Sequence, residues 1–92
     1  MVRVFVLYRQ EPPPERYAEH VELSRREVPE ATIRHGRVFG SPAGKPDYAY
    51  YFEFEFADRE AMKRSQVGLS KSAEDAQGIG TPFEVLFADV EE

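Results

Sequence analysis

Cysteine and tryptophan are both absent from this sequence, and no long hydrophobic run occurs in it. Without cysteine there are no disulfides, no thiolate nucleophile and no cysteine-ligated metal. No apolar stretch approaches the roughly 20 residues that a membrane-spanning helix needs. The N-terminus lacks a basic segment followed by an apolar one, so we expect no signal peptide and a cytoplasmic location.

Basic residues are outnumbered by acidic ones, with 12 Lys and Arg against 17 Asp and Glu, and the net charge is −5. A protein that neutralises nucleic-acid phosphates needs a positively charged face, and binding to anionic membranes also needs positive charge on the protein. We therefore expect no nucleic-acid and no membrane partner. The 92 residues, 41% of them hydrophobic, predict one domain over residues 1–92 that is marginally stable alone.

The pattern of residues predicts strands and helices in alternation. Runs rich in β-branched and aromatic residues predict four strands, at 2–8, 31–39, 48–56 and 83–90. Helical periodicity, Pro14 in a first turn and Pro29 as a stop predict a helix over 15–28. Asp58 as N-cap and Gly68 as C-cap predict a helix over 58–67, and a short helix follows at 70–77. Gly36 inside the second strand suggests a bulge or a close backbone approach.

This βαββαβ order predicts an α+β fold of the ferredoxin-like kind, an antiparallel sheet with helices on one face. Both faces of the first and last strands are hydrophobic, however: Phe5 and Leu7 oppose three valines on the first strand, and Leu86 and Ala88 oppose Phe87 on the last. Burying about five such side chains at roughly 1.5–3 kcal/mol each rivals the stability of a small domain, about 5–15 kcal/mol. We therefore predict a homodimer that pairs through its sheet faces. The alternative is a set of ordinary exposed hydrophobic residues.

Three stretches of the chain resemble a known family. They are the opening strand MVRVFVLYR, the segment RVFGSPAGKPDYAYYFEFEFADREAM and the closing FEVLFADVEE. Together they cover just under half of the sequence. On these residues the chain resembles the EthD-like proteins of the dimeric α/β-barrel superfamily.

The resemblance implies a homodimer in which two sheets face each other as a barrel, with a pocket in each subunit between sheet and helices. Relatives in the superfamily include cofactor-free monooxygenases, polyketide cyclases, isomerases and dehalogenases, so no cofactor is expected. The first helix of the family commonly carries an aromatic residue and one or two histidines, followed by a Pro-Leu pair. Tyr17 and His20 match the first part of this pattern, whereas the Pro-Leu pair is absent.

His20 and Tyr17 are the candidate catalytic residues. His20 lies on the edge of the helix face that turns toward the sheet, beside Tyr17 and Ser24. An imidazole there titrates near neutral pH and can act as a general base or orient a phenolic substrate. The alternative is a structural histidine at the edge of the core, satisfied by a hydrogen bond.

Aromatic residues make up 13% of the chain and suit a pocket for a planar, apolar ligand. The candidate substrate-binding residues are Tyr8, Tyr50, Tyr51 and Phe52. The alternative is ordinary packing within the strands.

Two carboxylates, Glu53 and Glu55, share one face of the third strand. Arg3, Arg34 and Glu84 on neighbouring strands can lie across from them. We expect these charges to pair across strands or across the dimer seam, with acid–base chemistry as the alternative. No metal site is predicted, because the two histidines lack a convincing third ligand.

The sequence leaves two functions open. The first is a pocket protein that binds an aromatic or polyketide-like metabolite and converts it by proton transfer, cyclisation or oxidation without a cofactor. The second is a non-enzymatic accessory or ligand-carrying dimer. A regulatory ligand-sensing domain is a weaker third interpretation, because no DNA-binding module is attached.

Overall fold

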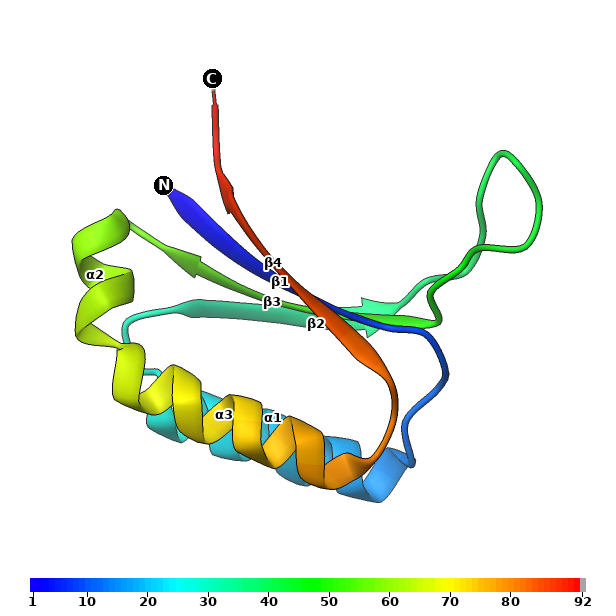
Figure 1. Cartoon of the computed structure of the whole chain (residues 1–92), viewed down its shortest axis with the longest axis horizontal. Helices are drawn as coiled ribbons and strands as arrows, with labels where there is room; N and C mark the ends of the chain where they lie inside the picture. The colour runs from blue at the N-terminus through cyan, green and yellow to red at the C-terminus, as the bar shows by residue number, and fades with distance from the viewer. Residues whose placement is uncertain (92) are drawn as a thin grey trace.

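The structure, a computed structural model, describes residues 1–91. Its elements follow the predicted order (Figure 1), and a split second helical segment separates the last two strands. The strands are β1 (Val2–Tyr8), β2 (Thr32–Arg37), β3 (Tyr50–Phe56) and β4 (Phe83–Asp89). The helices are α1 (Pro14–Glu27), α2 (Arg59–Arg64) and α3 (Gln66–Ile79). Within residues 1–91, no helix is long and apolar enough to cross a membrane.

The four strands form one sheet in the order β2-β3-β1-β4, with every neighbouring pair antiparallel. The strand β1 is central and pairs with both β3 and β4, which places Val4 between Phe54 and Phe87. This arrangement confirms the predicted α+β, ferredoxin-like βαββαβ fold. The edges of the sheet are β2, which carries mostly polar side chains, and β4, which carries apolar ones.

All three helices lie on the same side of the sheet (Figure 1). The hydrophobic core lies between them and the sheet, where alternate residues of each strand point inward. The aromatic side chains of Tyr8, Phe52 and Phe56 are almost fully buried there. The buried face therefore carries the valines of β1 and the phenylalanines of β3.

The buried face of α1 is the one that its periodicity predicts. Pro14 occupies the first turn, where its missing N–H leaves no bond unmade. Tyr17, His20, Val21 and Ser24 are all buried. The helix ends just before Pro29.

The helices that follow β3 are divided differently from the prediction. Asp58 is the N-cap of α2 as expected, since its carboxylate accepts a hydrogen bond from the Ala61 N–H at 2.8 Å. The break between helices falls at Ser65, however, and Gly68 lies inside α3. The prediction that Gly68 ends a helix was therefore wrong. Gly68 serves instead for close packing, since a Cβ built there would lie 1.9 Å from the carbonyl oxygen of Glu27.

Gly36 does not produce a bulge. The register between β2 and β3 runs without interruption and pairs Gly36 with Tyr51. A Cβ at Gly36 would lie 3.0 Å from the Tyr51 ring, so the glycine makes room for that ring. The close-approach alternative was the correct one.

The face of the sheet away from the helices combines apolar and charged side chains. Phe5, Leu7 and Tyr51 are half-buried on it, and Leu86 is 50% exposed. Its charged residues form an ion-pair cluster, with Arg3 and Arg34 lying 3.0 and 3.3 Å from Glu55, and Arg34 3.6 Å from Glu53. This cluster confirms cross-strand pairing for the two glutamates. Glu84 lies outside it and pairs with Arg9 and Tyr48.

Candidate functional site

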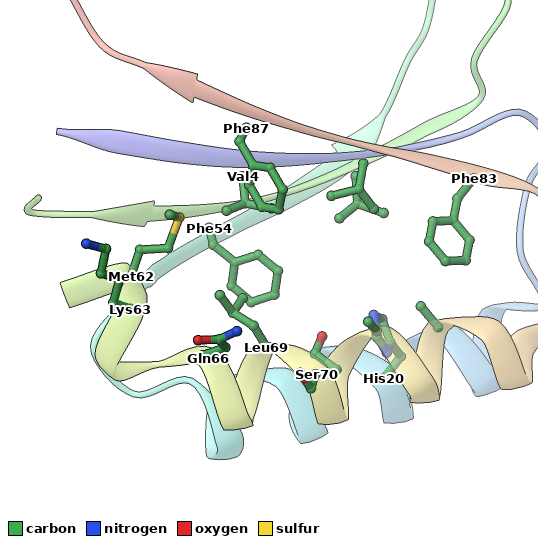
Figure 2. A pocket seen from close by; sticks show the side chains of 15 residues that line it. Val4, His20, Phe54, Met62, Lys63, Gln66, Leu69, Ser70, Phe83 and Phe87 are labelled. Carbon is green, nitrogen blue, oxygen red and sulfur yellow. The ribbon is translucent and has the colours of Figure 1, made fainter. Parts of the chain in front are cut away.

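A cavity of about 450 Å³ lies between the sheet and the helices α2 and α3. Figure 2 shows side chains of the sheet pointing into it from one side and side chains of α3 from the other. Most of its walls are apolar. The strands contribute Val4, Val6, Phe54, Phe83, Val85 and Phe87, and α2 and α3 contribute Met62, Lys63, Gln66, Leu69, Ser70, Ser72, Ala73 and Ala76, with His20 from α1.

Unequal side chains on the two long helices explain why this space is empty. Over β2 and β3, α1 presents the ring of Tyr17, which packs against Tyr50 and Phe52. Over β1 and β4, α3 presents Ala73 and Ala76, which are too small to fill the space between the helix and the sheet. The cavity is therefore a consequence of the composition of α3.

The cavity opens to solvent between β4 and the start of α3. Phe87 and Val85 are lining residues of β4 and are 69% and 42% exposed. Gln66 and Lys63, from the opposite side of the opening, are also exposed. An apolar interior with a few polar groups is typical of small-molecule sites.

His20 forms the inner, polar end of this cavity. Its side chain is 2% exposed and lies in the wall on the helix side (Figure 2). The imidazole packs against Phe52, with ring centroids 5.3 Å apart. Its Nδ1 lies 2.8 Å from Oδ2 of Asp75 on α3. The ring is thus held by packing on one side and by a hydrogen bond on the other.

Asp75 is held in turn by Arg16, one turn before His20 on α1. The guanidinium of Arg16 donates to Oδ1 at 2.7 Å and to Oδ2 at 3.2 Å. The Arg16 hydrogen bond holds the pKa of Asp75 below its usual range, so this carboxyl is ionised at neutral pH. Burial lowers the pKa of His20 below 6.5, although Asp75 acts in the opposite direction. At neutral pH the site therefore contains a carboxylate and a neutral imidazole, which can accept a proton.

The seam between α1 and α3 is polar along much of its length. Beyond the Arg16–Asp75–His20 contacts, the hydroxyls of Ser24 and Ser72 share a hydrogen bond of 2.7 Å. Because both serines are buried and bonded to each other, neither is left without a partner. These contacts fix α3 relative to α1, and so fix the wall of the cavity.

Tyr17, predicted as a catalytic partner of His20, lies one turn away but is not in the cavity wall. Its hydroxyl donates to the carbonyl oxygen of Tyr51 at 3.4 Å. Burial raises the pKa of this phenol, so it stays protonated at neutral pH. A catalytic role for Tyr17 stays a prediction.

The four predicted substrate-binding residues are not brought together around the cavity. Tyr8 and Phe52 are buried in the core, 0% and 1% exposed. Tyr50 accepts a hydrogen bond from Arg37 at 2.9 Å near the β2 edge. Tyr51 lies on the face of the sheet away from the helices. Their binding role also stays a prediction.

Sequence reasoning missed the most important partner of His20. Asp75 lies three residues after Ser72 on the inner side of α3, a spacing that helical periodicity would have revealed. The predicted helix over 70–77 contains both residues, but nothing in the sequence indicates which residues of α1 this face meets. Within the described part of the chain, no group of three His, Asp or Glu residues is arranged to hold a metal ion.

Fold and cavity together define a ferredoxin-like α+β domain with a ligand-sized space between its sheet and helices. No protein-family model matches the chain, and no curated protein matches it in sequence. Among solved structures, an ethyl tert-butyl ether D (EthD) family protein from Bacillus halodurans matches with a TM-score of 0.80 and 22% identity, over 99% of both chains. The structural match confirms, at the level of the fold, the resemblance to EthD-like proteins that the sequence predicts.

Two further structures share the fold at lower identity. A dimeric ferredoxin-like protein of unknown function from Jannaschia has a TM-score of 0.73 and 19% identity, over 97% of this chain and 98% of that one. SnoaB, a cofactor-independent oxygenase from Streptomyces nogalater, has a TM-score of 0.60 and 16% identity, over 99% and 92%. At these identities the similarity concerns the fold.

Proposed function

We propose that this protein is a homodimeric pocket protein that binds an aromatic or polyketide-like metabolite and converts it by proton transfer without a cofactor. The observation that carries the proposal is a neutral, buried imidazole at the inner end of a mostly apolar cavity. The catalytic group is His20, acting as a general base on a weakly acidic O–H or C–H of the ligand.

The shape and lining of the cavity support an apolar ligand. A volume of about 450 Å³ accommodates a molecule of two or three fused rings. Phe54, Phe83 and Phe87 offer aromatic surfaces for a planar molecule. Burying such a ligand removes apolar surface of the ligand and of the cavity wall from water, which favours binding.

The chemistry of His20 supports proton transfer as the common step. Cyclisation, isomerisation and cofactor-free oxidation of such metabolites all begin when a base removes a proton and leaves an enolate or phenolate. A base whose lowered pKa keeps it unprotonated is ready for that step at neutral pH. The fold likeness to a cofactor-independent oxygenase agrees with chemistry of this kind.

The uncovered face of the sheet supports the homodimer. Phe5, Leu7 and Leu86 lie on it as neighbours, because β1 and β4 pair Phe5 with Leu86. A second copy of the same face would shelter them symmetrically. The structurally similar Jannaschia protein is dimeric.

A reaction that needs only a positioned base tests the catalytic part. In the Kemp elimination of 5-nitrobenzisoxazole, a base removes the carbon-bound proton, the N–O bond breaks and a coloured cyanophenolate forms. We expect saturable catalysis by the wild type and its loss in His20→Ala, while the His35→Ala control stays active.

Binding is tested separately by calorimetry with the same probe. Ala73→Phe should block the cavity, whereas Ala18→Phe, on the exposed side of α1, should not affect binding. Binding without catalysis would favour the ligand-carrying dimer, and no binding to wild type would contradict both functions.

A further inference from the structure

The contacts of Asp75 decide which nitrogen of His20 carries the proton. The carboxylate accepts hydrogen bonds from Arg16 and can only accept one from the ring, at 2.8 Å. A neutral imidazole bears one proton, and here it must lie on Nδ1, donated to Oδ2. The other nitrogen, Nε2, therefore keeps its lone pair. Within residues 1–91, the structure gives Nε2 no hydrogen-bond partner.

The charges around the cavity disfavour an anionic group at its inner end. Arg16, the nearest cation to His20 in these contacts, is fully engaged with the side chain and the carbonyl oxygen of Asp75. Lys63 lies at the opening and is paired with Glu60 at 3.5 Å. The ionised Asp75 would repel a second carboxylate placed beside His20.

We propose that the site selects a neutral, apolar ligand whose buried end donates a hydrogen bond to Nε2 of His20, through the orientation that Asp75 imposes on the ring. The ligand class is thus hydroxyl-bearing aromatic or enolic molecules, as opposed to carboxylates or molecules whose only polar atom is an acceptor. The inference rests on the proposed binding cavity and makes Asp75 a positioning residue.

Three probes of similar size test this selectivity by calorimetry. They are 1-naphthol, which donates a hydrogen bond, 1-acetonaphthone, which only accepts one, and 1-naphthoate, which is an anion. We expect the wild type to bind 1-naphthol roughly tenfold more tightly than 1-acetonaphthone, the worth of one hydrogen bond, and 1-naphthoate most weakly. In His20→Phe the difference between the two neutral probes should disappear.

Asp75→Asn should reverse the preference between the neutral probes. Arg16 only donates, so the new amide must turn its oxygen toward Arg16 and its NH₂ group toward Nδ1 of His20. The ring then accepts at Nδ1 and carries its proton on Nε2, which becomes a donor that favours the ketone. If Asp75 had only a structural role, Asp75→Asn would weaken the binding of both neutral probes equally.

A measurement on the wild type keeps the inference testable if the variant does not fold. The ¹⁵N chemical shifts of the imidazoles report the tautomer directly, with His35 as the second signal. We expect the Nδ1–H form for His20, and an Nε2–H form would overturn the inference. Equal binding of all three probes, unchanged in His20→Phe, would also overturn it while leaving the cavity proposal intact. If no probe binds, the proposed function itself fails.

Discussion

Gly68 and Glu27 lie so close that a Cβ on the glycine would be 1.9 Å from the glutamate's carbonyl oxygen. Of the two glycines of α3, Gly68 is the one that lies against the backbone of α1. Short side chains then meet along the seam, as the 2.7 Å bond between Ser24 and Ser72 shows. The geometry of the candidate site therefore depends on a backbone contact about two turns away from it.

Replacing Gly68 by alanine should push the helices apart. The clash is with backbone atoms, which cannot move aside as a flexible side chain can. We expect a loss of about 1–3 kcal/mol in the free energy of unfolding, measured by urea denaturation. Gly78→Ala in the same helix is the control, because the nearest atom to its Cβ would be a side-chain nitrogen of Arg16 at 3.3 Å, and no backbone atom lies closer. That variant should be neutral or up to about 1 kcal/mol more stable, and equal losses in both would contradict the packing argument.

Stability should fall when the pH drops below about 6.5. Burial lowers the pKa of His20 in the folded state, whereas the unfolded chain binds the proton at an ordinary pKa of 6.5. The unfolded state then carries more protons, so stability is full above that pH and decreases as the pH falls toward the lower folded pKa. The free energy of unfolding, measured between pH 8 and pH 5, checks this.

Two variants show which histidine causes the pH dependence of stability. His20→Gln should remove the larger part of it, because His20 is almost fully buried. His35→Gln should remove a smaller part. Desolvation also lowers the pKa of His35, but this side chain is more exposed to water than that of His20. A pH dependence that is unchanged in His20→Gln would contradict a buried, neutral His20.

A charge on the uncovered sheet face should prevent pairing of two copies. Leu86→Glu places a carboxylate within the proposed interface, next to Phe5 of β1, and we expect the dimer to dissociate to a folded monomer in sedimentation velocity runs at micromolar concentration. Val67→Glu introduces the same charge at a position of α3 that is 71% exposed and should leave the dimer intact. A wild-type monomer at these concentrations would refute the sheet-face interface.

The hydroxyl of Tyr8 offers a test of the buried core. It is buried without a hydrogen-bond partner within residues 1–91, and burial raises the pKa of the phenol to about 12. Because an unpaired buried hydroxyl is unfavourable, Tyr8→Phe should leave stability unchanged or raise it by about 1 kcal/mol. Tyr17→Phe is the matched control and should lose up to about 1 kcal/mol with its bond to Tyr51. Thermal denaturation of both variants measures these changes. A clear loss of stability in Tyr8→Phe would indicate that the Tyr8 hydroxyl has a hydrogen-bond partner, such as a buried water.

Much of the fold was predictable from local pattern. The buried face of α1, with Tyr17, His20 and Ser24, follows from a repeat of 3.6 residues, and the two faces of β3 follow from strict alternation. The order of the elements then left the ferredoxin-like sheet as the natural solution. The partner of His20 was not predictable in the same way, because periodicity places Asp75 near Ser72 on one face of α3 but does not say which residues of α1 that face meets.

The sequence by itself determined which residues face the core, the antiparallel α+β fold and the position of His20 on the inner face of its helix. These depend on periodicity, which is a property of neighbours along the chain. Only the tertiary structure decided that Asp75 meets His20, that the small residues of α3 leave a cavity beside β1 and β4, and that the tyrosines do not line it. Such features depend on how closely two helices approach, and this distance is set by contacts such as Gly68 against Glu27 between residues far apart in the sequence.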